Sequence, residues 1–267
     1  MDPSENLAAE YSAKASAYAR LWSPVIRPMA LPLLPALPLK TAARVLDVGT
    51  GTGALLTDLK EAAPAATVIG VDRAHGMLQA AHQSGHRLVT VTDAQRLGIR
   101  TGVIDVAVMI FVLFHLPKPL LGLREVYRAL RDGGTLGILT WGHDPGAPGL
   151  SIWREELDSE NAAPDPRDPQ VMRQDSMDTP EKLRRLLNDA GFVSVNVWSR
   201  DAAHQWTRED LMAMQVSCGM PARRLPSLSI TQRARCEQRV RTRLGLLTEA
   251  ELEYRPEVLL AVARRPD

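Results

Sequence analysis

The stretch from Val45 to Ala54 constrains this chain most, because it has the pattern of a short apolar strand that runs into a glycine-rich turn. Its sequence is VLDVGTGTGA, and a segment with Leu55, Leu56 and Leu59 on one face follows directly. Strand, tight turn and helix are therefore expected in succession. Alternate glycines allow positive φ angles and close approach of a ligand, and the helix offers unpaired N–H groups at its N-terminus. The pattern predicts a nucleotide-type binding turn.

Two kinds of ligand compete for this turn. Gly49, Gly51 and Ala54 satisfy the permissive G-x-G-x-x-G/A fingerprint, in which the turn cradles the pyrophosphate of a dinucleotide. Asp47 lies two residues before the first glycine, and a carboxylate there would repel a pyrophosphate but suit a ligand with an ammonium group. The D-x-G-x-G-x-G pattern resembles motif I of the class I methyltransferases, which bind S-adenosylmethionine (SAM). A glycine turn without any ligand is the third interpretation.

Two further carboxylates follow in the order that a SAM site requires. Asp72 ends the second predicted strand, residues 66–71, about 20 residues beyond the turn, where an acid binds a ribose hydroxyl pair. Asp93 and Ala94 follow the third predicted strand, 88–91, and resemble the next cofactor segment of the family. That resemblance implies that Asp93 accepts from the adenine amino group. Taken singly, each acid could instead cap a helix or form a turn.

The apolar run 104–114 predicts a central parallel strand that is buried on both faces. With His115 it resembles the FDxVxxxxxLHHLP segment of the ubiquinone-biosynthesis-type methyltransferases, a methyltransferase type 11-like family of small-molecule enzymes. Ile110 replaces the usual polar residue, and Phe114 replaces the first histidine. The segment also lacks the Asn-Pro-Pro-Tyr sequence of the amino-methyltransferases that act on nucleic-acid bases or protein glutamine. An apolar acceptor, or one with a carbonyl or hydroxyl group, is therefore expected.

Residues 1–40 are expected to form a helical lid. A 3.6-residue spacing predicts a helix over 5–20, with Tyr11 and Tyr18 on roughly one face. The phrase YSAKASAY resembles the family segment Y-x-x-x-A-x-x-Y, which implies that this helix folds over the cofactor and that a tyrosine hydroxyl reaches the cofactor carboxylate. Packing of both tyrosines against the core is the alternative.

Residues 41–267 are expected to form the SAM-binding α/β domain. The alternation of strands and helices predicts a doubly wound, seven-stranded, mostly parallel, Rossmann-like sheet. Helical cap insertions are expected at about 144–178 and 201–250.

Two histidines are candidates for a general base, since an unperturbed imidazole pKa of about 6.5 suits proton removal at neutral pH. His115 follows the fourth predicted strand, and His143 follows the fifth, residues 135–141. The motif and its resemblance predict contacts with SAM, or with S-adenosylhomocysteine after transfer, for the following residues: Tyr11, Tyr18, Asp47, Gly49, Thr50, Gly51, Gly53, Asp72, Arg73, Met77, Asp93, Ala94 and Phe111.

Composition narrows the class of partner. A net charge of +1 gives no electrostatic reason to expect DNA or RNA. Five prolines break the apolar run 21–39, and the polar N-terminus does not resemble a signal peptide, so we expect a cytoplasmic protein without a membrane span. Cys218 and Cys236 lack metal-ligand spacing, so no metal is expected. The sequence is compatible with a homodimer.

These features predict a SAM-dependent methyltransferase that moves a methyl group to O, N or C of a small, largely apolar acceptor, as in secondary metabolism. A SAM-binding cyclase or rearrangement catalyst on the same fold, without methyl transfer, is the alternative. A nicotinamide-dependent oxidoreductase is disfavoured by Asp47 and by the pair Asp93 and Ala94.

Overall fold

One seven-stranded sheet forms the centre of the computed structural model, which describes residues 3–267. The strand order is β3-β2-β1-β4-β5-β9-β6. The strands are β1 (Arg44–Val48), β2 (Thr67–Asp72), β3 (Val89–Val91), β4 (Ile104–Ile110), β5 (Leu130–Trp141), β6 (Val193–Asp201) and β9 (Glu257–Arg264). The first five are parallel, and β9 is antiparallel to both β5 and β6. The predicted seven-stranded, mostly parallel, Rossmann-like sheet is confirmed.

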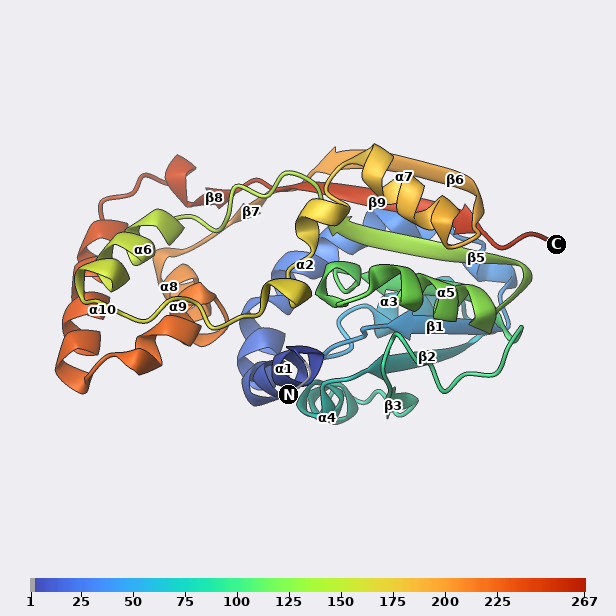
Figure 1. The fold of residues 1–267 in the computed structure, drawn as a ribbon, viewed down its shortest axis with the longest axis horizontal. Helices are drawn as coiled ribbons and strands as arrows, with labels where there is room; N and C mark the ends of the chain where they lie inside the picture. The colour runs from blue at the N-terminus through green and yellow to red at the C-terminus, as the bar shows by residue number, and fades with distance from the viewer. Residues whose placement is uncertain (1–2) are drawn as a thin grey trace.

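The strand β1 occupies the point where the strand order reverses. It pairs with β2 on one side and with β4 on the other (Figure 1), and Val45, Leu46 and Val48 are fully buried. Such a run of buried apolar residues is expected for a parallel strand covered on both faces. In open α/β sheets, ligands bind beyond the carboxyl ends of the strands at this reversal. The residues that follow β1 are therefore at the expected binding edge.

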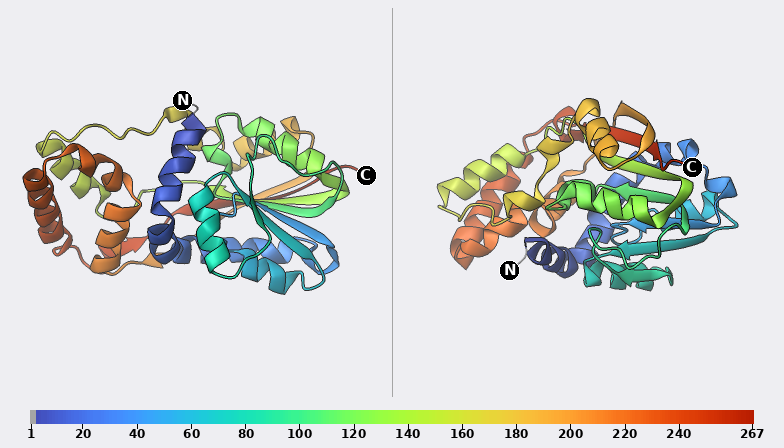
Figure 2. Two further views of the ribbon diagram at one scale, coloured as in Figure 1. Left: turned by 90° about the horizontal axis from the view of Figure 1, so that it is seen from below. Right: turned by 45° about the vertical axis from the view of Figure 1, so that its right-hand side comes forward.

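Helices cover both faces of the sheet (Figure 2). The main ones are α3 (Leu56–Ala62), α4 (His75–Gln83), α5 (Pro119–Ala129) and α7 (Pro180–Asp189). Short 3-10 turns lie between the larger elements: η1 (Leu31–Ala36), η2 (Leu39–Thr41), η3 (Leu113–His115), η4 (Pro169–Val171), η5 (Gln174–Ser176), η6 (Leu225–Ser227) and η7 (Ala250–Leu252). Thr179 caps the N-terminus of α7, since its side chain accepts from the Lys182 N–H.

The N-terminal segment forms α1 (Pro3–Leu21) and α2 (Ser23–Ala30), which we call the lid; Met1 and Asp2, its first two predicted residues, lie outside the described residues. Helix α1 packs closely on α4 at Gly76, whose N–H donates to Ser12 Oγ at 3.1 Å. A Cβ on Gly76 would come within 2.5 Å of the Ser12 carbonyl oxygen, so this approach requires glycine. Arg27 of α2 makes a bidentate pair with Asp58 of α3.

The two segments predicted as insertions pack together beside the sheet. Helices α6 (Leu150–Ser159), α8 (Arg208–Ser217), α9 (Met220–Arg224) and α10 (Ile230–Leu244) gather on the left of Figure 1, and we call them the cap. The two short strands β7 (His204–Gln205) and β8 (Glu253–Tyr254) pair beside it.

The helices α6 and α10 of the cap are joined by ion pairs. Glu156 of α6 and Glu160, which directly follows the helix, are buried, and three arginines of α10 pair with them: Arg235, Arg239 and Arg243. A buried carboxylate needs such partners, because burial without them is costly. The arginine-rich sequence of α10 therefore belongs to the seam with α6.

Two element boundaries differ from the prediction. The fourth strand ends at Ile110 instead of continuing to 114, because Phe111 adopts a positive φ of 53° and a 3-10 turn follows it. The fifth strand begins at Leu130, since residues 131–134 form an irregularity within the pairing with β4 and not a separate turn before the strand. Across residues 3–267, no helix combines the length and the apolarity needed to cross a bilayer.

The substitution Leu46→Ala is expected to lower the free energy of unfolding by about 2–5 kcal/mol, because it leaves a cavity at the centre of β1. Leu46 is 0% exposed, whereas Leu246 is 80% exposed, so Leu246→Ala is the control and should change stability by about 0.5 kcal/mol or less. Urea denaturation followed by circular dichroism measures both. A loss for Leu46→Ala as small as that of the control would contradict this assignment of the core.

Candidate functional site

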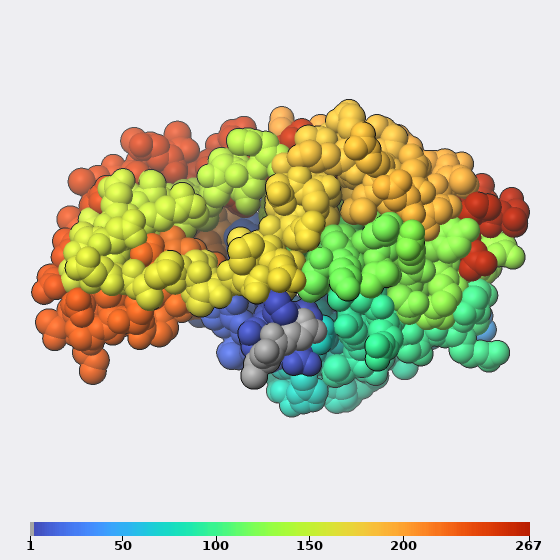
Figure 3. Space-filling view, viewed as in Figure 1, coloured from blue at the N-terminus to red at the C-terminus, as the bar shows by residue number. Residues whose placement is uncertain are grey.

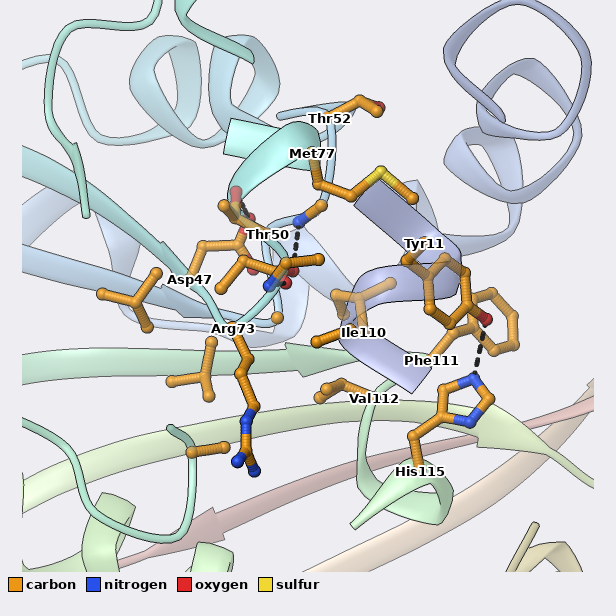
Figure 4. Close-up of a pocket in the computed structure, with 18 of the residues that line it drawn as sticks. Tyr11, Asp47, Thr50, Thr52, Arg73, Met77, Ile110, Phe111, Val112 and His115 are labelled. Atoms are coloured by element: carbon orange, nitrogen blue, oxygen red, sulfur yellow. Dashed lines mark hydrogen bonds between the residues drawn. The ribbon is translucent and has the colours of Figure 1, made fainter. Parts of the chain in front are cut away.

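A cavity of about 1130 Å³, counting the part that is open to solvent, lies between the lid and the carboxyl ends of β1, β2 and β4. Figure 4 shows Asp47 and Thr50 on one side of it and Tyr11 with His115 on another. Most of the predicted cofactor-binding residues line it: Tyr11, Tyr18, Asp47, Gly49, Thr50, Gly51, Asp72, Arg73, Met77, Asp93, Ala94 and Phe111. The fold therefore brings together residues that are spread over the first half of the chain.

Asp47, the last residue but one of β1, is a buried carboxylate without a cationic partner within residues 3–267. It is 2% exposed, and its Oδ2 accepts a hydrogen bond from Thr50 Oγ1 at 2.7 Å. Burial is the main cause that raises the pKa of Asp47 to about 7. The hydrogen bond from Thr50 opposes this rise, and the nearby charge of Asp72 adds to it. A buried carboxyl group in this state is suited to receive a cation from a ligand.

The glycine turn owes its shape to positive φ angles, which are 76° at Gly49 and 56° at Gly51. The N–H groups of Gly49 and Thr50 both donate to the carbonyl of Val71, so the turn is anchored to β2. A Cβ on Gly51 would meet no atom within 4 Å, so the space beside this residue is open. Glycine is favoured here because of the positive φ angle and not because of crowding.

Gly53 differs from the other glycines of the motif because it does not line the cavity. A Cβ on Gly53 would lie 2.7 Å from Cδ2 of His86. Its positive φ of 80° and this close contact give it a role in the packing of the turn against the segment after α4. The structure therefore does not support the predicted cofactor contact for Gly53.

Asp72 ends β2 beside the glycine turn. Its Oδ2 accepts from the Gly51 N–H and its Oδ1 from the Ala74 N–H, both at 2.8 Å. Burial raises the pKa of Asp72, and the backbone hydrogen bonds partly oppose this rise. Each carboxylate oxygen can accept a second hydrogen bond, so an oriented acceptor pair remains for a ligand diol.

Asp93 and Arg73 form the third polar part of the cavity wall. Asp93 accepts from the Gln95 N–H at 2.8 Å and from Arg73 Nη1 at 3.2 Å. Arg73 also donates to Ser4 and pairs with Glu5 at 3.6 Å, so it connects the lid to the end of β3. Met77 adds a buried apolar surface to the same wall.

His115 lies in the cavity wall as a link between three segments. Its Nδ1 is 3.1 Å from the Val171 carbonyl, which can only accept, so Nδ1 carries the proton; Nε2 then accepts from the Tyr11 hydroxyl at 3.0 Å. Burial, with the charge of Arg167 as a smaller contribution, lowers the pKa of His115 to about 4. With both nitrogens engaged and a low pKa, this imidazole does not fit the predicted general base.

His143 lies outside the cavity. It is exposed on the turn after β5, where its backbone N–H donates to Glu257 Oε2 at 3.1 Å and its carbonyl accepts from the Glu257 N–H at 2.8 Å. These contacts tie the turn to β9, and His143 is not among the residues that line the cavity. The predicted role of His143 as a base is therefore not supported, because a position after a strand does not determine the direction of the turn.

Four charged residues, which we call the lid clasp, hold α1 to both insertions: Glu10, Asp165, Arg167 and Arg223. Arg167 makes two hydrogen bonds of 3.1 Å to Glu10 and lies 5.6 Å above the ring of Tyr11. Burial alone would raise the pKa of Glu10, but hydrogen bonds from Arg167 and Lys14 hold it below its usual value. Glu10 and Arg167 are 157 residues apart, so no local sequence signal could have revealed the pair.

The lid also reaches the glycine turn through Ser23, whose hydroxyl lies 2.9 Å from Thr52 Oγ1. Both residues line the cavity; Thr52 belongs to the glycine motif, whereas Ser23 belongs to no motif that the sequence made visible. Within residues 3–267, no group of three or more His, Cys, Asp or Glu is arranged to hold a metal ion.

Comparison with known proteins finds similarity to methyltransferases over part of this chain. Residues 46–138 match the family model of a methyltransferase domain. The malonyl-[acyl-carrier protein] O-methyltransferase of Geobacter sulfurreducens is 33% identical over 163 residues, which cover 60% of this chain and 59% of the relative. The demethylmenaquinone methyltransferase of Thermus thermophilus is 38% identical over 117 residues, or 42% of this chain and 53% of the relative. The chain thus matches between half and three fifths of the length of these relatives.

Solved structures share the fold at low sequence identity. A phosphoethanolamine N-methyltransferase of Haemonchus contortus, in complex with S-adenosyl-L-methionine, aligns with a TM-score of 0.55 and 19% identity over 96% of this chain and 57% of that one. A SAM-dependent methyltransferase of Archaeoglobus fulgidus aligns with a TM-score of 0.54 and 16% identity over 92% of this chain and 97% of that one. Residues 46–138 are thus similar to a methyltransferase domain, and the chain shares the Rossmann-like fold of these solved methyltransferases.

Proposed function

We propose that the protein is a SAM-dependent methyltransferase that acts on a small, largely apolar acceptor. The observation that carries this proposal is the buried carboxyl of Asp47, which has no cationic partner in the described chain and lies at the glycine turn. An ammonium group on the ligand would satisfy it, whereas a pyrophosphate would not. SAM carries such an ammonium group on its methionine moiety.

The order of three carboxylates supports the same ligand. Asp47, Asp72 and Asp93 lie at or just beyond the carboxyl ends of β1, β2 and β3, which are neighbours in the sheet. Adjacent strands are about 4.8 Å apart, so the acids lie in a row that suits an extended ligand. In this arrangement Asp47 holds the ammonium group, Asp72 the ribose hydroxyls and Asp93 the adenine amine.

Bound SAM would supply a methyl group that its sulfonium already activates. The chain's own contribution is then to align the acceptor and to exclude water. The lid lies over the cavity, and the contact of Tyr11 with His115 and the lid clasp hold it there. Ile110 and Phe111 line the cavity at the end of β4, which supports an apolar acceptor.

The alternative is a catalyst of rearrangement or cyclisation that binds SAM without methyl transfer. The apolar residues Ile110 and Phe114 are compatible with it. Mass spectrometry of the product separates the two. A mass gain of one CH₂ supports methyl transfer, and an unchanged elemental composition supports the alternative.

The substitution Asp72→Asn is expected to weaken binding of S-adenosylhomocysteine about tenfold or more, because the neutral amide cannot act as a two-oxygen acceptor for both ribose hydroxyls. Isothermal titration calorimetry measures the dissociation constant. Asp132→Asn is the control, since the side chain of Asp132 is 70% exposed and pairs with Arg265. Unchanged affinity in Asp72→Asn would remove the ribose assignment, and no binding to the wild-type protein at about millimolar ligand would overturn the proposed function.

Binding of S-adenosylhomocysteine is expected to weaken as the pH falls below about 7, the pKa of Asp47. The carboxylate form binds the ligand ammonium, and its population falls about tenfold for each pH unit below the pKa, so the dissociation constant should rise by up to the same factor. Above that pKa the affinity should level off.

In Asp47→Asn the same titration should be flat and the binding weaker throughout, because the group that titrates has been removed. Equal pH profiles for the wild-type protein and this variant would contradict the role of Asp47.

The substitution Tyr11→Phe is expected to speed dissociation of S-adenosylhomocysteine about tenfold. It removes the hydrogen bond to His115 and leaves a buried nitrogen unpaired, which costs about 1–3 kcal/mol in the closed lid. Stopped-flow measurement of the dissociation rate tests this. Tyr127→Phe is the control, because Tyr127 packs on Phe192, away from the cavity. Equal rates in both variants would show that the Tyr11 contact does not hold the lid.

A further inference from the structure

Five aromatic side chains from distant parts of the chain meet beside the cavity. This aromatic wall consists of Trp22, Phe111, Trp141, Trp206 and Tyr254. Trp22 of the lid is central to it, with ring centroids 6.5 Å from Trp141, 6.3 Å from Trp206 and 6.2 Å from Tyr254. Trp22 is half-buried, and the other four are buried. The lid, the sheet and the second insertion all contribute to one surface.

Phe111 joins the aromatic wall to the cavity. It lines the cavity, and its ring stacks on Trp141 with centroids 4.1 Å apart. Its φ angle is positive, at 53°, which costs about 1–3 kcal/mol for a residue other than glycine. Such backbone strain is kept only where the surrounding structure holds it, and it is found most often at functional sites. Phe111 and Trp141 follow or end β4 and β5, which lie on the opposite side of β1 from β2 and β3. The wall is therefore on the acceptor side of the proposed cofactor site.

Two buried polar atoms at the wall have no hydrogen-bond partner within the described residues. Trp206 is 2% exposed, and its Nε1 is unpaired. Gln174 donates through Nε2 to the Trp141 carbonyl, which identifies its unpaired Oε1 as the acceptor. By contrast, Trp153 in the cap donates to Gln215 Oε1 at 2.5 Å. A buried unpaired group costs about 1–3 kcal/mol, so each of these atoms points to a ligand group.

The surface is hollowed next to this region. In Figure 3 an opening lies between the yellow-green and yellow limbs of the first insertion, and blue atoms of the lid and orange atoms of the second insertion are visible at its bottom. Those are the segments that supply Trp22 and Trp206. The opening therefore reaches the segments of the lid and of the second insertion from which the wall is built.

We propose that the aromatic wall binds the acceptor, and that the acceptor is a flat ring system that bears a carbonyl and a hydroxyl group. The ring packs against the wall as aromatic rings do, the carbonyl oxygen accepts from Trp206 Nε1, and the hydroxyl donates to Gln174 Oε1. Trp206 and Gln174 are then the residues that determine specificity. This inference rests on the proposed function and adds the class of acceptor to it.

Calorimetry on protein saturated with S-adenosylhomocysteine tests the proposal. The probes are umbelliferone, a flat hydroxylated coumarin, and coumarin itself, which keeps the carbonyl but lacks the hydroxyl; mildly acidic pH keeps the phenol protonated. Menthol, which has a hydroxyl but no flat ring, is the negative control. Umbelliferone is expected to bind more tightly than coumarin, and menthol is expected not to bind.

Two variants assign the polar contacts. Trp206→Phe should weaken both coumarins about tenfold, the effect of one lost hydrogen bond, while Trp198→Phe on β6, which lies outside the wall, should leave them unchanged. Gln174→Met should weaken umbelliferone to the level of coumarin and leave coumarin unaffected. Unaltered affinity for S-adenosylhomocysteine and an unaltered circular dichroism spectrum show that each variant is folded.

The outcomes separate the two proposals. If S-adenosylhomocysteine binds but neither coumarin does, or if Trp206→Phe and Trp198→Phe behave alike, the acceptor class is wrong and the proposed function stands. If S-adenosylhomocysteine itself does not bind, both proposals fail.

Discussion

The burial of one carboxyl group, that of Asp47, is the constraint on which the site depends. The sheet places it at the end of the central strand β1, with a neighbour on each side, and the chain offers it one hydrogen bond from Thr50 and no cation among the described residues. A group in that position favours its neutral form, as its pKa of about 7 reflects. Burial of the Asp47 carboxylate is thus unfavourable in the protein alone, and a cationic ligand bound beside it would compensate for this cost.

The lid covers the cavity that Asp47 lines, and several contacts hold it in place. Helix α1 can lie over the cavity because Gly76 allows its backbone to approach α4. Once there, it is held through Tyr11 by His115, and through Glu10 by arginines of both insertions. The low pKa of His115 suits this structural role, since a neutral imidazole can donate to Val171 and accept from Tyr11 at the same time. Cofactor site and cap are therefore connected by short polar contacts.

The sequence predicted the sheet and the row of carboxylates well, because both depend on local patterns: apolar runs followed by glycines or acids. It could not predict what depends on the direction of a turn or on distant pairs. His143 follows a strand as expected, yet its turn is tied to Glu257 of β9 and His143 does not line the cavity. The strand that ends at Ile110 was predicted to continue, because Phe111 is apolar and nothing local indicates its positive φ. The pair Glu10 and Arg167 spans 157 residues.

The similarity to known proteins includes the cofactor side of the site but little of the aromatic wall. The family model ends at residue 138, so it includes β1, β2, β3 and their three carboxylates, which form the cofactor side of the site. Of the aromatic wall it includes only Phe111; Trp22, Trp141 and Trp206 lie outside it. The part of the chain that the family model matches is therefore the part that would hold a common cofactor. The part that would choose the acceptor is built mostly from the lid, the end of β5 and the second insertion. For this part, a relative's substrate is a poor guide to the substrate of this protein.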